Sequence, residues 1–224
     1  MPSIEVIRGP ASARYGSNAM HGVINVVSKP IEDINTISSN IGPNGYTNFK
    51  SSIGNSDDWR INSFFSTDDG FREESGYHQQ KLQIKNRFNL YNSDAIFNLR
   101  LTNLNQETAG YISGKDVYKD RRQSKENLNP EAYRDAFSLK SSLKFSLGPK
   151  DKIVSFIPYF RKTKMEFLQH YLPGTPVEKN SHSSLGFIGL HSGISKNIEI
   201  TSGIQVEIAK VELEELQEFA LTTS

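Results

Sequence analysis

The stretch I-E-V-I-R-G-P-A-S-A-R-Y-G-S-N-A-M-H-G-V-I-N-V-V-S-K, residues 4–29, decides the fold. Its two apolar runs, residues 4–7 and 23–27, are β-branched and too short for helices, so we expect them to be buried strands. Between them, glycines supply backbone freedom or close approach, and Pro10 stiffens the turn. Arg8 ends the first run, where an unpaired charge is costly, so we expect it to meet a carboxylate or backbone carbonyl groups.

This segment resembles the end of the plug domain of TonB-dependent outer-membrane receptors. In that family a pattern close to I-E-V-I-R-G-P-x-S-x-x-Y-G-x-x-A-x-x-G-V-I-N-V closes the plug just before the barrel begins. The matching positions are Ile4, Glu5, Val6, Arg8, Gly9, Pro10, Ser12, Tyr15, Gly16, Ala19, Gly22, Val23, Ile24, Asn25 and Val26. His21 departs from the pattern, which has glycine more often there, and this affects only local packing.

Composition excludes several classes of protein. Lys and Arg number 26 against 25 for Asp and Glu, so there is no bulk charge to attract nucleic acid. Without cysteine there is no thiol nucleophile and no Cys-based metal site. The sequence has no apolar stretch long enough for a transmembrane helix, and M-P-S-I-E-V is not a signal peptide. Mean hydropathy is −0.52, which a transmembrane β-barrel also shows because its strands face lipid only at every second residue.

After residue 30 the chain alternates between apolar and polar residues, which is typical of half-buried strands. The alternation is clearest over residues 81–90, 95–102, 137–147 and 198–208, and weaker over 34–42, 46–54, 59–67, 152–164 and 183–193. Asn44-Gly45 predicts a hairpin turn. Pro158 predicts a bulge or an edge strand. Residues 211–221 fit a strand or a helix equally well.

The connections between these strands also follow a pattern. Residues 68–77, 106–133 and 166–182 are the longer connections, and those between them are about four residues. A membrane barrel has tight periplasmic turns and larger extracellular loops, so the three longer ones are predicted to be extracellular. The fold class we expect is all-β: a partial antiparallel transmembrane β-barrel of about nine strands, preceded by the end of a plug domain. Because plugged transporters have about 22 strands, we expect a fragment, with plug residues 1–30 and barrel residues 31–224.

The resemblance implies a function and two contact residues. In the family, the arginine of the R-G-P motif helps to lock the plug to carboxylates of the barrel wall, which assigns a plug–barrel contact to Arg8 with Glu5. The family takes up scarce ligands actively: most often a ferric siderophore, otherwise cobalamin, haem or oligosaccharides. TonB, energised by ExbB and ExbD, pulls on the plug through a segment that would precede Met1. The implied location is the outer membrane of a Gram-negative bacterium, in contact with outer-membrane lipid.

Two of the predicted loops contain candidate ligand-binding residues. Tyr111, Arg121 and Arg122 lie in the longest connection, where basic and aromatic groups suit an anionic iron chelate. His170 and Tyr171 lie in the connection 166–182. A solvated loop without ligand, facing anionic lipopolysaccharide in the first case, is the competing interpretation.

Catalysis has no support in the sequence. There is no GxSxG motif, P-loop, HxxxH pair or cysteine, so we expect neither an enzyme nor a metal site nor a cofactor. Two alternatives remain for the function. A secreted carbohydrate-binding β-sandwich would alternate equally well but predicts neither the loop pattern nor the plug motif. A truncated chain could also lack any activity of its own, since it would leave two open sheet edges.

Overall fold

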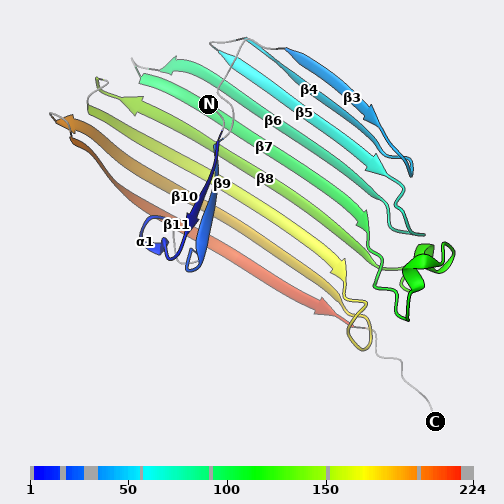
Figure 1. The fold of residues 1–224 in the computed structure, drawn as a ribbon. Coiled ribbons are helices and arrows are strands. Elements are labelled where there is room, and N and C mark those ends of the chain that lie inside the picture. The colour runs from blue at the N-terminus through cyan, green and yellow to red at the C-terminus, as the bar shows by residue number, and fades with distance from the viewer. Residues whose placement is uncertain are drawn as a thin grey trace.

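The computed structural model describes residues 3–15, 19–27, 35–55, 58–90, 93–149, 152–195 and 198–217. Two separate antiparallel sheets account for its strands (Figure 1). The smaller contains β1 (Ser3–Arg8) and β2 (Gly22–Val27), with the short α1 (Ser12–Tyr15) between them. The larger contains β3 (Thr36–Ile41), β4 (Thr47–Gly54), β5 (Trp59–Asp68), β6 (Tyr77–Leu90), β7 (Ser93–Glu107), β8 (Tyr133–Leu147), β9 (Lys152–Leu168), β10 (Val177–Ser195) and β11 (Ile198–Leu216).

The larger sheet is a meander in which every strand pairs with its neighbours in chain order. It has nine strands, with β3 at one edge and β11 at the other, so the described residues form an open sheet. The strands lie side by side in a curved layer (Figure 1). The nine strands confirm the fold class expected from the alternation. The first hairpin is tight because Asn44 and Gly45 both have positive φ, 56° and 68°, as the sequence predicted for this turn.

The two faces of the nine-stranded sheet differ in polarity. Strand register places residues of one parity together across the sheet; for example, Phe160 faces Leu185, which faces Ile208. This face is apolar yet exposed: Leu185 is 66% and Ile208 79% accessible. Among the described residues, the buried hydrophobic side chains are only Ala19, Ala95 and Ala132. A β-sandwich would bury one face of each sheet against the other, so the carbohydrate-binding sandwich is wrong.

Several expectations about element boundaries need correction. The predicted loop 166–182 is shorter, because β9 continues to Leu168 and β10 begins at Val177. Residues 211–216, which fitted strand or helix, continue β11 and pair with β10. The strands are longer than predicted because their ends pair with neighbouring strands. This pairing cannot be predicted from the local sequence.

Pro158 causes neither the bulge nor the edge that the sequence predicted. It lies in β9, between β8 and β10, and faces Phe187 in an unbroken register. The register on the β8 side is also unchanged across it, with Ser142 facing Tyr159 and Phe145 facing Phe156. Pairing with β8 is interrupted over two residues there, at Leu143 and Lys144, and resumes in the same register because the long strands pair on both sides of the gap.

The β1–β2 hairpin forms as predicted, but its burial differs. Gly9 has a φ of 89°, a backbone conformation that favours glycine. A side chain at Gly22 would meet the Ile7 carbonyl oxygen at 2.9 Å, so glycine there allows the two strands to approach closely. The strands are not buried, since one face of the hairpin, with Ile4 and Ile24 each 71% accessible, is exposed. The reason is that the described chain supplies no second layer for this two-stranded sheet.

Candidate functional site

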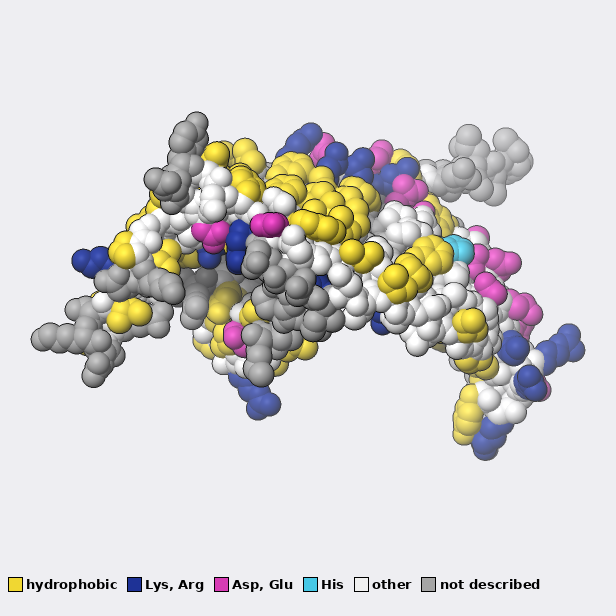
Figure 2. Space-filling view, turned by 90° about the horizontal axis from the view of Figure 1, so that it is seen from above, with side chains coloured by type: hydrophobic (Ala, Val, Ile, Leu, Met, Phe, Trp, Pro, Cys, Tyr) yellow, Lys and Arg dark blue, Asp and Glu magenta, His cyan; other side chains and the backbone are white. Residues whose placement is uncertain are grey.

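The hairpin lies on the polar side of the nine-stranded sheet. Val26 of β2 lines a cleft together with Asn62, Lys81 and Arg100 of β5, β6 and β7. The sheet curves around this side (Figures 1 and 2). The polar face is therefore the inner wall of the partial barrel, and the apolar face is its outside. The hairpin lies on the inner side of the partial barrel, where Val26 shares a cleft with wall residues and stays 65% accessible.

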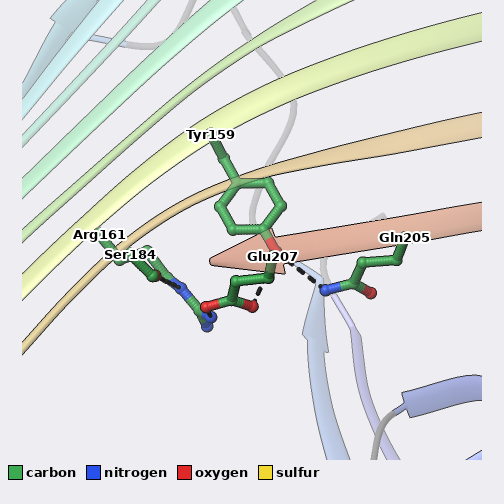
Figure 3. Close-up of polar contacts among 5 residues, drawn as sticks. All are labelled: Tyr159, Arg161, Ser184, Gln205 and Glu207. Carbon is green, nitrogen blue, oxygen red and sulfur yellow. Dashed lines mark hydrogen bonds and ion pairs between the residues drawn. The ribbon is translucent and has the colours of Figure 1, made fainter. Parts of the chain in front are cut away.

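A connected polar cluster lies on the inner wall of β9, β10 and β11 (Figure 3). Glu207 accepts a hydrogen bond from the Tyr159 hydroxyl at 2.8 Å and forms an ion pair with Arg161. Gln205 donates to Tyr159 at 3.0 Å, and the Arg161 Nε donates to Ser184 at 3.2 Å. The cluster joins three strands, and because each polar group has a partner, the carboxylate and the guanidinium are held in fixed positions.

Five basic residues lie in two adjacent rows of the inner wall, because Lys85 faces Asn98 on β7 while Arg100 faces Gln83 on β6. Arg60 on β5 faces Lys85 on β6, and Lys140 on β8 faces both Arg100 on β7 and Arg161 on β9. Three of them, Arg100, Lys140 and Arg161, line one cleft of about 350 Å³ together with Tyr159 and Gln205. Glu207 on β11, in the neighbouring row with Tyr159, forms an ion pair with Arg161. A wall of this charge favours an anionic occupant.

The predicted plug–barrel residues lie on β1. Glu5 accepts a hydrogen bond from the Asn25 amide at 2.8 Å, so its carboxylate is held within the hairpin. Arg8 is exposed, and the described part of the chain offers it no ion-pair partner. Residues three apart on a strand point to opposite faces, so Glu5 and Arg8 do not share a face. Glu207, an inward-facing carboxylate, is already engaged by Arg161 and Tyr159.

The three longer loops contact one another at one end of the sheet. Arg72, in the connection 69–76, donates to the carbonyl oxygens of Gly110 and Glu126 in the connection 108–132. Asn127 donates to the Glu74 carbonyl at 3.0 Å, which strengthens the same contact. The longest loop contains two short 3₁₀ turns, η1 (Val117–Lys119) and η2 (Gln123–Lys125). These loops therefore form a connected cap.

The structure brings some of the predicted loop residues together. A side chain at Gly110 would lie 3.3 Å from the His170 Nε2, so the segment carrying Tyr111 touches the segment carrying His170 and Tyr171. Tyr111 is 81% and Tyr171 65% accessible. The Nδ1 of His170 is buried without a hydrogen-bond partner among the described residues, and its ring packs edge-on against Tyr171.

Arg121 and Arg122 lie apart from this group. They precede the second 3₁₀ turn and are exposed. The Arg122 backbone N–H is held by the Asp120 carboxylate at 2.8 Å, so the two side chains extend from an ordered turn. Within the described ranges, no group of acidic, histidine or cysteine residues could hold a metal ion. No helix in the part of the chain that the structure describes is long and apolar enough to cross a membrane.

Two groups of functional residues were missed by the sequence analysis. Arg72 gave no signal, because its carbonyl partners lie far along the chain. For the cluster of Tyr159, Arg161 and Glu207, the sequence showed only that polar residues alternate along each strand. That side chains of β9 reach Glu207 of β11 across β10 follows from the strand register, which the sequence does not contain.

The fold is that of a partial barrel with the end of a plug, as in TonB-dependent outer-membrane receptors. Two solved structures are similar to it. The ferric-catecholate import receptor Fiu from E. coli K12, in an open form, matches 92% of this chain with a TM-score of 0.70 at 15% identity. The siderophore receptor PiuA from Acinetobacter baumannii matches 95% of this chain with a TM-score of 0.71 at 12% identity. The chain spans 39% and 35% of the length of these two receptors.

Sequence similarity is confined to a short segment. The chain is 62% identical over 29 residues to a probable TonB-dependent siderophore receptor, PirA, from Acinetobacter baumannii strain ATCC 19606. The match covers 13% of this chain and 4% of that receptor. No protein-family model matches the chain. The fold and a short stretch of sequence are thus both similar to those of siderophore receptors.

Proposed function

We propose that the chain forms the end of the plug, residues 1–30, and the first part of the barrel, residues 31–224, of an outer-membrane receptor for TonB-dependent uptake. The ligand class we propose is an anionic ferric siderophore, in preference to cobalamin, haem or an oligosaccharide. Two siderophore receptors share the fold, and a third shares a short stretch of sequence. The basic side chains on the inner wall suit a negatively charged chelate. The location that follows is the outer membrane.

The observation that carries this proposal is the division of one sheet into two faces. The outer face exposes aliphatic and aromatic side chains with no protein layer over them, which suits lipid. The inner face is polar and basic, and it shares a cleft with Val26 of the hairpin. A wall with lipid on one side and a charged, plugged lumen on the other is suited to gated transport, with no covalent chemistry.

In this mechanism the ligand first meets the loop cap. Tyr111 and Tyr171 offer exposed aromatic faces beside His170, while Arg121 and Arg122 add charge from the same loop as Tyr111. TonB, energised by ExbB and ExbD, would then pull on the plug. Contacts of Glu5 and Arg8 with the wall would be exchanged as the plug moves.

Uptake of a radioactive ferric chelate tests the proposal. The receptor that contains this chain, hereafter the whole receptor, is expressed in E. coli cells lacking their own catecholate receptors. We expect uptake of an iron-55 catecholate complex that disappears in a tonB deletion. Uptake that continues without TonB, or no binding of any anionic ferric chelate, would contradict the proposal.

Loop variants locate the ligand site. Combined substitution of Tyr111→Ala and Tyr171→Ala removes two exposed aromatic faces, each worth about 0.5–2 kcal/mol toward a charged partner. We expect the dissociation constant of the ferric chelate to rise by about tenfold or more. The matched control is Tyr118→Ala, an exposed tyrosine of the same loop that is 70% accessible. Equal affinity of the double variant and the wild-type receptor would remove these residues from the site.

The chain by itself is proposed to have no transport activity. The sheet has two free edges, β3 and β11, and an exposed apolar face. Such edges and faces promote aggregation unless other strands cover them. Gel mobility of residues 1–224 in detergent, with and without boiling, tests this. Absence of a heat-dependent shift is expected, whereas a clear shift would show that these strands close a barrel by association of chains.

A further inference from the structure

The inner face carries a basic residue on each of five successive strands. From β9 to β5 these residues are Arg161, Lys140, Arg100, Lys85 and Arg60, hereafter the basic path. Arg161, Lys140 and Arg100 face one another in one row. Lys85 and Arg60 lie in the next row towards the short connections. The basic path therefore crosses these five strands without a gap.

The basic path also descends along the wall. Arg161 lies in the middle of β9 (Lys152–Leu168), whereas Arg60 is the second residue of β5, directly after the short connection 55–58. The strands of a barrel are tilted and staggered, so a row of paired residues climbs along the wall. The basic path therefore leads from the middle of the inner wall to the end of the sheet where the short connections lie.

Two residues of the basic path repel each other. Arg100 and Lys140 lie directly opposite on adjacent strands, where like charges are destabilising. Both are exposed, and neither forms an ion pair within the described residues. Arg161, which faces Lys140 from the other side, is paired with Glu207. An anion between Arg100 and Lys140 would relieve their repulsion, so the wall favours an anionic occupant at this point.

Two clefts follow the basic path. The first, of about 350 Å³, is lined by Arg161, Lys140 and Arg100, and the second, of about 310 Å³, by Arg100, Lys81 and Asn62. Arg100 belongs to both, so the two clefts adjoin. Among the described residues, no Asp or Glu lines either cleft. An anion that leaves the first cleft therefore enters the second without meeting a negative charge in its lining.

The hairpin of β1 and β2 borders the second cleft with an apolar side chain, Val26. The Glu5 carboxylate accepts a hydrogen bond from Asn25 and lines neither cleft. The described part of the hairpin therefore offers the two clefts no carboxylate. Displacement of the hairpin would remove Val26 from the lining and widen the second cleft.

We propose that an anionic ferric chelate passes through the barrel along the inner wall of β9 to β5, from Arg161 past Lys140 and Arg100 towards Arg60. The inference rests on the proposed function for the ligand and for the direction of passage. Passage requires binding that is favourable enough for entry but divided over several positions, so that the ligand can leave. Five basic residues on successive strands provide such divided contacts. The competing occupant is an acidic segment of the plug, which would pair with the same residues in the closed receptor.

Binding and uptake, measured separately, test the passage. The variant Arg100→Gln/Lys140→Gln of the whole receptor is expressed in E. coli cells lacking their own catecholate receptors, and the probe is an iron-55 catecholate complex. Its dissociation constant in cells with a tonB deletion should stay within about twofold of wild type, because the loop cap captures the ligand. The maximal rate of uptake in cells with TonB should fall by about tenfold, the order expected for a lost charge-assisted contact. Arg100→Lys/Lys140→Arg keeps both charges and should retain at least about half of the wild-type rate.

The matched control is Lys162→Gln/Lys164→Gln, which removes two charges from the outward face of β9 and should leave uptake within about twofold of wild type. Uptake by the Arg100→Gln/Lys140→Gln variant at the wild-type rate would overturn the inference. A dissociation constant that rises as much as the rate falls would also overturn it, since the two residues would then belong to the capture site.

Entry of the neutral tetrasaccharide stachyose into tonB-deleted cells with the Arg100→Gln/Lys140→Gln variant, but not with the wild type, would assign the two residues to the closed plug and overturn the passage. If the wild-type receptor takes up no ferric chelate, the proposed function fails and the passage fails with it. Full uptake by both the wild type and the variant contradicts the passage alone.

Discussion

The two faces of the nine-stranded sheet are made from the same strands, but their side chains differ in polarity and charge. The outer face presents Leu185 and Ile208 to the surroundings, whereas the inner face presents Arg100, Lys140 and Arg161. Neither face is covered by a second layer of protein in the described chain. Under the proposed function, the difference has one physical reason: burial is decided by two solvents, lipid outside and a water-filled lumen inside, and not by a protein core.

The largest effect should come from reversing the polarity of the outer face. Leu143 is outward on β8, and arginine near the bilayer centre costs about 2–4 kcal/mol. We therefore expect Leu143→Arg to lower the free energy of unfolding of the whole receptor in lipid vesicles by that amount. Ser142→Arg, one residue away on the inner face, is the matched control and should cost less than about 1 kcal/mol. Equal costs for both would contradict the assignment of the faces.

On the inner face, removal of the Glu207 carboxylate tests how much the ion pair with Arg161 stabilises the wall. Glu207→Gln leaves Arg161 without its ion pair, and charge-assisted hydrogen bonds contribute about 1.5–3 kcal/mol. Because Arg161 is 40% exposed, we expect a loss of about 1–2 kcal/mol in unfolding free energy, measured by urea titration in vesicles. Addition of Arg161→Met should recover part of this loss. No recovery in the double variant would show that Glu207 acts independently of Arg161.

Arg72 tests whether the loop cap depends on one side chain. Arg72→Ala removes the hydrogen bonds to Gly110 and Glu126, so we expect amide hydrogen exchange over residues 108–132 to accelerate about tenfold. Global unfolding should hardly change, since the strands remain paired. Lys119→Ala, which breaks only contacts within the same loop, to Asp116 and Tyr118, is the control. Similar exchange in both variants would mean that the loops are held by other contacts.

The smallest effect concerns the outermost ion pair. Lys179 and Glu166 are 3.4 Å apart with about two-fifths of each side chain exposed. Exposed pairs contribute about 0.2–1 kcal/mol, so Lys179→Ala should change unfolding free energy by less than about 0.5 kcal/mol. A double-mutant cycle with Glu166→Gln measures the coupling. A coupling above about 1 kcal/mol would show that this region is more buried in the membrane than its accessibility indicates.

Alternation along single strands was enough to predict most of the fold. The parity of Phe137, Leu139 and Leu143 against Lys140 and Lys144 needs no partner strand to be recognised, because successive residues of a strand point to opposite sides. The positive φ of Asn44 and Gly45 likewise follows from residue type. The ends of β9 and β10 could not be predicted, because Leu168 and Val177 are held in strands by pairing with each other.

The candidate site was predicted only in part. Tyr111 and His170 were singled out by residue type, and the structure brings their loops into contact. Arg72 was missed because main-chain carbonyl partners leave no trace in a sequence. The contacts expected of Glu5 and Arg8 with the wall remain predictions, since Glu5 is bound to Asn25 and Arg8 is exposed.

The sequence by itself predicted a short β-hairpin, which resembles a plug end, and then a series of amphipathic strands, because residue type and a period of two are local properties. Only the tertiary structure decided which side chains meet across strands. Lys140 faces Arg100 and Arg161, and Glu207 reaches Tyr159 across β10, because register fixes these neighbours. The same register gathers Lys162 and Lys210 at one margin of the outer face. Register depends on the sum of the pairing along each ladder, and no single segment contains that information.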